Sequence, residues 1–266
     1  MKLLKQCYNL YRKNIPAIER KSAVAKYIDQ TWNYAVRDSI VKYDTSSTTK
    51  ITAMGLFDAV EALRLNNKEE FYPIDKDLNQ VTNTSLIFHA VSLDDNRANI
   101  YTPILVNSKY TNTSSQQRFK DSLIEVWFSG GHRDVGGGPS NKRELSTVSL
   151  HWMLNQITRF GLFRDSIFAV HPLGFVHNTA NSIIFSPIHK NRNIPFYYQN
   201  RVDSFHGKIK IHISVIKRLE SGALPRFKIL PYQRDWYDLP PFNTCFDKIN
   251  GGRKLKPDCS CIEVIE

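Results

Sequence analysis

One short stretch constrains the fold of this chain more than any other: an apolar run that ends abruptly in glycines and a histidine. The run Leu123 to Phe128 is short, aromatic and β-branched, which is typical of a buried strand. The pair Gly130 and Gly131 lets the backbone turn directly after it, because glycine carries no Cβ. We therefore expect His132 to lie just past the carboxyl end of a strand, where open α/β sheets place their chemistry.

Three further runs predict strands. Ile51 to Phe57 is apolar and ends at Asp58, so a carboxylate follows this strand directly. Leu86 to Leu93 begins a third element, and it leads into a group of charged residues. Isoleucines alternate with polar residues from Lys208 to Leu219, which predicts a strand over that range.

The remaining segments are predicted to be helical or irregular. Apolar residues recur at helical spacing from Glu144 to Phe160 and, in two pieces, from Leu3 to Val41. Ala59 to Leu65 is long enough for a turn or two of helix. Prolines and asparagines predict irregular structure from Phe163 to Tyr198, and an extended tail from Pro225 to Pro241.

These residues suggest the acid and base of a serine hydrolase. Such an enzyme needs a hydroxyl nucleophile, a histidine that takes its proton and a carboxylate that orients the ring. His132 and Asp58 suit the last two roles. The alternative for His132 is a structural histidine that caps a turn, and the pattern leaves both open. We expect Asp134 to bond the glycine loop, rather than to serve as a second acid or as a metal ligand with His132.

The net charge of the chain limits the classes of partner that it is expected to bind. The formal net charge is +11 and the pI is near 9.4. This balance favours anionic partners, namely phospholipid surfaces, nucleic acid or an acidic protein, unless the charge is simply spread over a solvated surface. The sequence has no nucleic-acid recognition motif, so we expect no nucleic acid. It has neither a secretory signal nor an apolar run of about 18 residues. We expect synthesis in a cytoplasm, with export only by a route that reads no amino-terminal signal.

The cysteines favour reduced thiols. Cys7 stands alone, whereas Cys245, Cys259 and Cys261 lie near the carboxyl end. Nothing in the sequence indicates an oxidising compartment. The spacing of Cys259 and Cys261 is tighter than that of a common zinc knuckle, which disfavours a metal site in this tail.

Four stretches together resemble a known family. Trp127 to Gly138 is similar to the signature of the α/β-hydrolase family that includes phospholipase effectors of bacterial type VI secretion. Gly55 to Val60 resembles that family's strand ending in Asp-Thr-Val. His89 to Arg97 resembles its His-Ala-Leu-Ala-Leu-Asp-Glu-x-Arg segment. Ile211 to Leu219 resembles its Ile-His-x-Ser-Val-x-x-Arg segment.

The resemblance implies an acyl-ester hydrolase that acts on phospholipid or another acyl ester without a cofactor or metal. It implies that Asp58 and His132 are the catalytic acid and base. The surrounding loop would be supported by Asp134, Gly130, Gly131 and Gly136. The implied fold is α/β: an incomplete α/β-hydrolase-like three-layer sandwich with an irregular carboxyl-terminal extension. The basic net charge suits an anionic membrane surface as a further partner.

The chain also departs from the family pattern. It contains neither a Gly-x-Ser-x-Gly elbow nor an Asp-Gly-Thr-x-Asn strand. Position 59 is alanine where the family has threonine, and Pro139 stands where tyrosine is usual. We expect residues 1–266 to form a single α/β-hydrolase-like domain that lacks the amino-terminal nucleophile segment, which would precede Met1. A companion chain would then supply the serine; alternatively, the chain is an inactive pseudohydrolase that binds lipid or a protein.

Overall fold

The computed structural model describes part of the chain in detail. The described residues are 23, 26, 51–62, 84–97, 101–103, 123–138, 142–161, 169–177, 191–195, 208–223 and 235–266. The chain divides into two compact units, Met1–Lys50 with Asn67–Asn83, and Ile51–Asn66 with Thr84–Glu266. Nearly all described residues belong to the second unit. The helices predicted between Leu3 and Val41 lie outside the described residues, apart from Ala23 and Lys26, which are helical.

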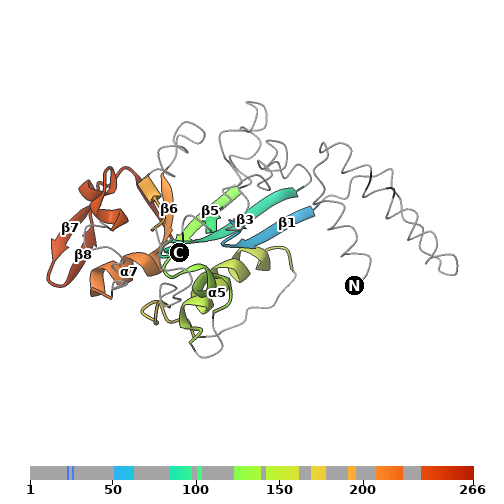
Figure 1. Cartoon of the computed structure of the whole chain (residues 1–266), viewed down its shortest axis with the longest axis horizontal. Coiled ribbons are helices and arrows are strands. Elements are labelled where there is room, and N and C mark those ends of the chain that lie inside the picture. Colours follow the sequence, from blue (N-terminus) through green and yellow to red (C-terminus); the bar gives the residue numbers. More distant parts are fainter. Residues whose placement is uncertain are drawn as a thin grey trace. The chain divides into compact units, whose positions relative to one another are not determined.

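A five-stranded parallel sheet forms the centre of the second unit (Figure 1). Its strands, in spatial order, are β1 (Ile51–Phe57), β3 (Thr84–Ser92), β5 (Leu123–Phe128), β6 (Ile209–His212) and β9 (Ile262–Ile265). Every neighbouring pair runs parallel. Because the carboxyl ends of parallel strands meet at one edge, the segments that follow β1, β3 and β5 come together there.

Helix α5 (Glu144–Thr158) covers one face of the sheet (Figure 1). Successive strand residues point to opposite faces, so alternate residues of β3 and β5 meet this helix. They form a buried cluster of Phe88, Ala90, Val126, Phe128, Val135, Val148, Trp152 and Met153. The predicted helix from Glu144 to Phe160 is confirmed, with its last turn ending two residues earlier.

The other alternate residues form a second core with the carboxyl-terminal part of the chain. Val91 and Trp127 pack there with Ile211 and with helix α7 (Ile213–Ser221). Tyr237, Phe242, Cys245 and Phe246 complete this cluster. The architecture is therefore mixed α/β, with a largely parallel sheet between two apolar layers.

Two local predictions are wrong. Residues Val60–Ala62 form a strand, β2, rather than helix, because they pair antiparallel with β4 (Tyr101–Pro103). The predicted strand from Lys208 to Leu219 stops at His212, whose imidazole accepts the Ser214 backbone N–H and begins α7. The alternating isoleucines led to the strand prediction, but Val215, Ile216 and Leu219 also recur at helical spacing and share one buried face of α7.

The carboxyl-terminal region is regular, not irregular as predicted. The expected extended tail contains a 3₁₀ turn, η3 (Trp236–Asp238), and η4 follows it (Phe242–Thr244). Strands β7 (Phe246–Ile249) and β8 (Gly252–Leu255) form a hairpin, and β9 returns to the central sheet.

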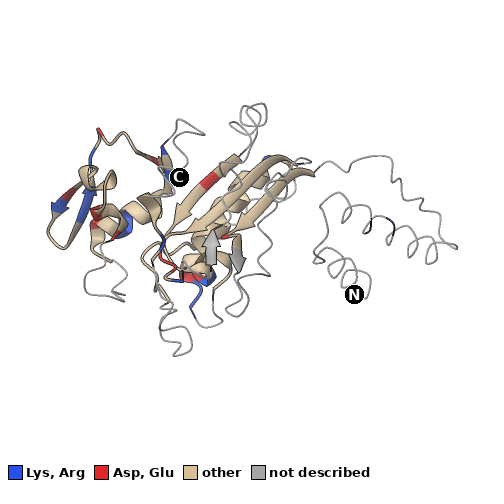
Figure 2. Ribbon diagram, turned by 45° about the horizontal axis from the view of Figure 1, so that its top comes forward, with Lys and Arg blue, Asp and Glu red and all other residues tan. Residues whose placement is uncertain are grey.

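Charge lies mainly outside the central strands. Figure 2 shows the sheet drawn mostly in tan, with blue and red residues on the hairpin and the connecting segments. Among the described residues, no helix has both the length and the apolar character needed to cross a membrane.

Candidate active site

Asp58 lies at the carboxyl edge of the sheet, in the turn after β1. Its backbone N–H donates to Ala90 O at 2.6 Å, and its φ of 42° is unusual for a residue other than glycine. The carboxylate is fully buried, and Oδ1 accepts the Ser92 backbone N–H at 2.8 Å. Backbone strain and burial of this kind gather at functional sites, so the position marks a candidate site.

His132 begins the short helix α4 (His132–Gly136) directly after β5 and the glycine turn. Its Nδ1 lies 2.8 Å from Asp58 Oδ2, and its side chain is 30% exposed. With the proton on Nδ1, His132 donates a hydrogen bond to the carboxylate, which leaves Nε2 as the ring position that can take a proton from a substrate or nucleophile. The structure thus brings together the two residues that the sequence singled out; their catalytic roles stay a prediction.

A buried arginine holds the other side of Asp58. Arg192 Nη1 donates to Asp58 Oδ1 at 2.6 Å, and Nη2 donates to Oδ2 at 2.9 Å. Burial acts to raise the pKa of the Asp58 carboxyl, but the Arg192 charge and the hydrogen bonds from His132, Arg192 and Ser92 outweigh it and lower the pKa to about 2. Asp58 is therefore an anion at any physiological pH. Sequence reasoning missed Arg192, because its segment shows no periodicity or motif.

Three successive backbone N–H groups fix the loop that carries His132. Each donates to a different aspartate, so the loop cannot rotate without breaking charge-assisted hydrogen bonds. The pairs are Gly130 N to Asp94 Oδ2 at 2.6 Å, Gly131 N to Asp134 Oδ2 at 2.9 Å, and His132 N to Asp95 Oδ2 at 2.9 Å. The prediction that Asp134 bonds the glycine loop is confirmed.

The aspartates of this loop differ in their environments. Burial raises the pKa of Asp94 to about 6, although the Gly130 hydrogen bond and the Arg218 charge act to lower it. Burial also acts to raise the pKa of Asp95, but the Arg97 hydrogen bond and the Arg192 charge lower it overall. Asp94 and Asp95 follow β3 as Asp58 follows β1, so their place at the sheet edge could have been read from the sequence.

His177 is a second histidine that the sequence did not single out. Its Nδ1 lies 2.5 Å from Asp134 Oδ1, and its backbone N–H donates to Asp134 Oδ2 at 3.0 Å. The segment before it therefore docks on the His132 loop. Gly136, expected to support this loop, ends α4 and is exposed.

Comparison with known proteins identifies a family. The family model described as "T6SS, Phospholipase effector Tle1-like, catalytic domain" matches residues 1–156. The matched range contains Asp58 and His132, whereas His177 and Arg192 follow it.

The comparison with curated proteins gives a shorter match. A 76-residue stretch is 38% identical to "Uncharacterized protein YEL023C" of Saccharomyces cerevisiae. It covers 27% of this chain and 11% of the yeast protein, so the chain matches only a small part of that relative. No solved structure matches the chain.

Proposed function

The chain belongs to the family of Tle1-like type VI secretion phospholipase effectors, and from this premise we propose that it supplies the acid and base of a serine hydrolase that cleaves acyl esters of phospholipids. The observation that carries the proposal is the 2.8 Å contact between His132 Nδ1 and Asp58 Oδ2 at the carboxyl edge of a parallel sheet. The same edge carries the chemistry of α/β-hydrolases, and we assign the chain to that fold.

In the proposed reaction, His132 Nε2 takes the proton of a serine hydroxyl as the oxygen attacks the ester carbonyl. The imidazolium then gives this proton to the leaving alcohol, and an acyl-enzyme forms. His132 next takes a proton from water as the water oxygen attacks the acyl carbon. The imidazolium then returns that proton to the serine oxygen, which releases the fatty acid and restores the serine. Asp58 keeps the imidazole in the required tautomer, and Arg192 keeps Asp58 ionised and in place.

The 266 residues contain no Gly-x-Ser-x-Gly motif that would carry the serine of this mechanism. We propose that the nucleophile comes from a segment or a companion chain outside them. The missing motif is also the observation that favours the second candidate function, a pseudohydrolase that binds lipid or a protein without cleaving it.

An apolar segment beside the site suits a lipid surface. Val170, Leu173 and Phe175 are 40%, 53% and 49% exposed. The segment is held in this position, because Arg218 donates to the carbonyl oxygens of Pro172 at 2.9 Å and Gly174 at 2.7 Å. Fixed, exposed apolar groups of this kind mark an interaction surface.

A basic side chain lies beside these apolar groups. Lys142 Nζ is 4.2 Å from the Phe175 ring centroid. Exposed apolar groups with a cation beside them match an anionic phospholipid bilayer, which we propose as the surface that this segment contacts.

The hydrolase proposal is tested with anionic phospholipid vesicles and the chain purified from its native cells, so that a segment or companion chain that carries the nucleophile is present. We expect fatty-acid release that falls at least about 100-fold in His132→Ala, because the general base is lost. His151→Ala removes a histidine of α5 that the proposed reaction does not use, and it should retain the wild-type rate. A serine-reactive fluorophosphonate followed by peptide mass spectrometry would identify the nucleophile. Equal, near-zero rates for the wild type and His132→Ala, with no labelled serine, would reject the enzyme in favour of the pseudohydrolase.

The membrane surface is tested by vesicle co-sedimentation. We expect the double variant Leu173→Ser, Phe175→Ser to bind anionic vesicles at least about tenfold more weakly, because two half-exposed apolar side chains no longer enter the bilayer interface. Leu150→Ser, at a residue that is 43% exposed on α5, is the matched control and should bind as the wild type does. Equal binding by both variants would reject this segment as the contact surface.

A further inference from the structure

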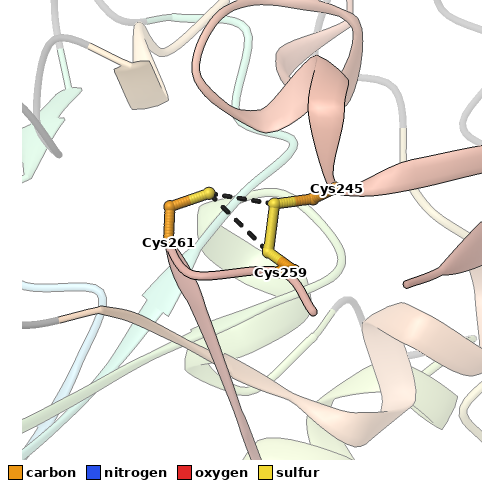
Figure 3. Close-up of side chains that lie close together, drawn as sticks. All are labelled: Cys245, Cys259 and Cys261. Atoms are coloured by element: carbon orange, nitrogen blue, oxygen red, sulfur yellow. Dashed lines mark hydrogen bonds between the residues drawn. A yellow bond between two sulfur atoms is a disulfide. The ribbon is translucent and has the colours of Figure 1, made fainter. Parts of the chain in front are cut away.

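Three cysteine sulfurs meet at one point in the carboxyl-terminal region (Figure 3). Cys245 and Cys259 form a disulfide, which corrects the expectation of reduced thiols. Cys261 Sγ lies 3.0 Å from Cys245 Sγ and 3.7 Å from Cys259 Sγ. Within the described residues, this group has the composition and spacing of a metal-ligand set.

Backbone contacts place the three cysteines, independently of the disulfide. The β7–β8 hairpin follows Cys245 and returns the chain to Lys256, whose N–H donates to Cys245 O at 2.8 Å. Cys259 N–H donates in turn to Lys256 O at 3.3 Å. Cys261 is fixed from the other side, because its carbonyl accepts the Ile209 N–H of β6 at 3.0 Å. The sulfurs would therefore stay close together after reduction.

The position of Cys261 shows what the third sulfur can do. A thiolate that attacks a disulfide must approach along the axis of the S–S bond. Cys261 Sγ instead lies beside the bond, within 3.7 Å of both partners (Figure 3). This arrangement does not suit thiol–disulfide exchange. The three sulfurs instead surround a common point, which a metal ion could occupy. In a tetrahedral zinc site, sulfurs at 2.3 Å from the ion lie about 3.8 Å from one another.

The exposure of the three cysteines also suits a bound ion. Cys245 and Cys261 are 2% and 5% exposed, whereas Cys259 is partly exposed and gives an ion access from solvent. Coordination by a metal ion deprotonates a thiol, so the buried sulfurs can bind as thiolates.

We propose that Cys245, Cys259 and Cys261, once reduced, bind one Zn²⁺ through three thiolates, with water as the fourth ligand. A dithiol reductant supplies two electrons and two protons to the disulfide and is itself oxidised to a disulfide. Zn²⁺ then replaces the three thiol protons, which pass to solvent. The ion would tie the start of the β7–β8 hairpin to Cys261 at the start of β9, whereas the disulfide joins the hairpin only to Cys259 in the preceding turn. The site is distinct from Asp58 and His132.

The test uses the full chain, reduced with a phosphine and freed of reductant without oxygen. Cd²⁺ is titrated first, because its thiolate bonds absorb in the ultraviolet in proportion to their number, and Zn²⁺ then competes for the site. We expect about one ion per chain for the wild type and for Cys7→Ser, which keeps all three ligands. Cys261→Ser should bind Zn²⁺ more than about 100-fold more weakly, since it removes a direct ligand.

Two further measurements keep the result decisive. Circular dichroism establishes that Cys261→Ser is folded, and Cys259→Ser, at the partly exposed position, should show the same loss of affinity without removing a buried side chain. If the reduced wild type takes up no Cd²⁺, or if Cys261→Ser binds as tightly as the wild type, the proposal is wrong and the group is a disulfide with a spare thiol. Neither outcome depends on the proposed lipase activity.

Discussion

Arg192→Leu is expected to lower the free energy of unfolding at pH 7 by about 3 to 5 kcal/mol, the usual cost of leaving a buried charge without its partner. Asp58 and Arg192 both have side chains that are 0% exposed, and two hydrogen bonds join them. Without the guanidinium, the Asp58 carboxylate would keep its burial and lose its cation. Urea unfolding followed by circular dichroism measures the change.

The pH dependence of this loss follows from the pKa of Asp58. In the wild type the folded pKa is about 2, below the unfolded value, so the stability from this group is fully present above about pH 4 and falls only below it. In Arg192→Leu, burial dominates and raises the folded pKa above the unfolded one. The variant therefore loses stability as the pH rises through that raised pKa. The difference between the two proteins should grow from pH 5 to pH 7.

Two variants provide the comparison. Lys210→Leu removes a partly exposed ion pair, in which Lys210 Nζ lies 3.3 Å from Glu263 Oε2, and should cost no more than about 1 kcal/mol. Arg192→Lys keeps the charge but cannot form both hydrogen bonds, so its stability should lie between those of the wild type and Arg192→Leu. A cost for Arg192→Leu as small as that for Lys210→Leu would show that the buried pair does not stabilise the fold.

The sequence predicted those parts of the site that depend on local patterns. Strands β1 and β5 are short apolar runs bounded by turn residues, and the glycine pair after β5 indicates a turn at the end of that strand. The meeting of Asp58 and His132 then needed only the assumption that the two strands run parallel in one sheet. Local chemistry and one topological rule were sufficient for this half of the site.

The rest of the site depends on contacts between residues far apart in the sequence, which no local sequence pattern predicts. Arg192 reaches Asp58 across 134 residues of sequence, from a segment with neither apolar periodicity nor glycine. His177 reaches Asp134 across 43 residues of sequence. The sequence from Ile209 to Val215 fits a strand and a helix equally well, and the capping contact of His212 decides between them. The disulfide was missed because Cys245 approaches Cys259 only after the β7–β8 hairpin forms.

Gly130→Ala is expected to disrupt the loop that holds His132. The residue has a φ of 108°, which a side chain rarely adopts, and a Cβ placed there would lie 2.5 Å from Asp134 Cβ. Strain and overpacking together should lower the free energy of unfolding by about 2 to 4 kcal/mol. The shift would also displace Asp134 from the Gly131 N–H and from His177. Urea unfolding measures the first effect, and the nuclear magnetic resonance signal of the His177 ring reports the second.

Gly136→Ala is the matched control, because the substitution is the same and the residue lies in the same loop region. A Cβ at Gly136 meets no atom within 4 Å, and alanine favours the helical conformation found there. Its stability should therefore stay within about 1 kcal/mol of the wild-type value. If the two variants unfold at the same urea concentration, the tight packing of Gly130 on Asp134 does not fix the loop. The three aspartate contacts would then have to hold His132 by themselves.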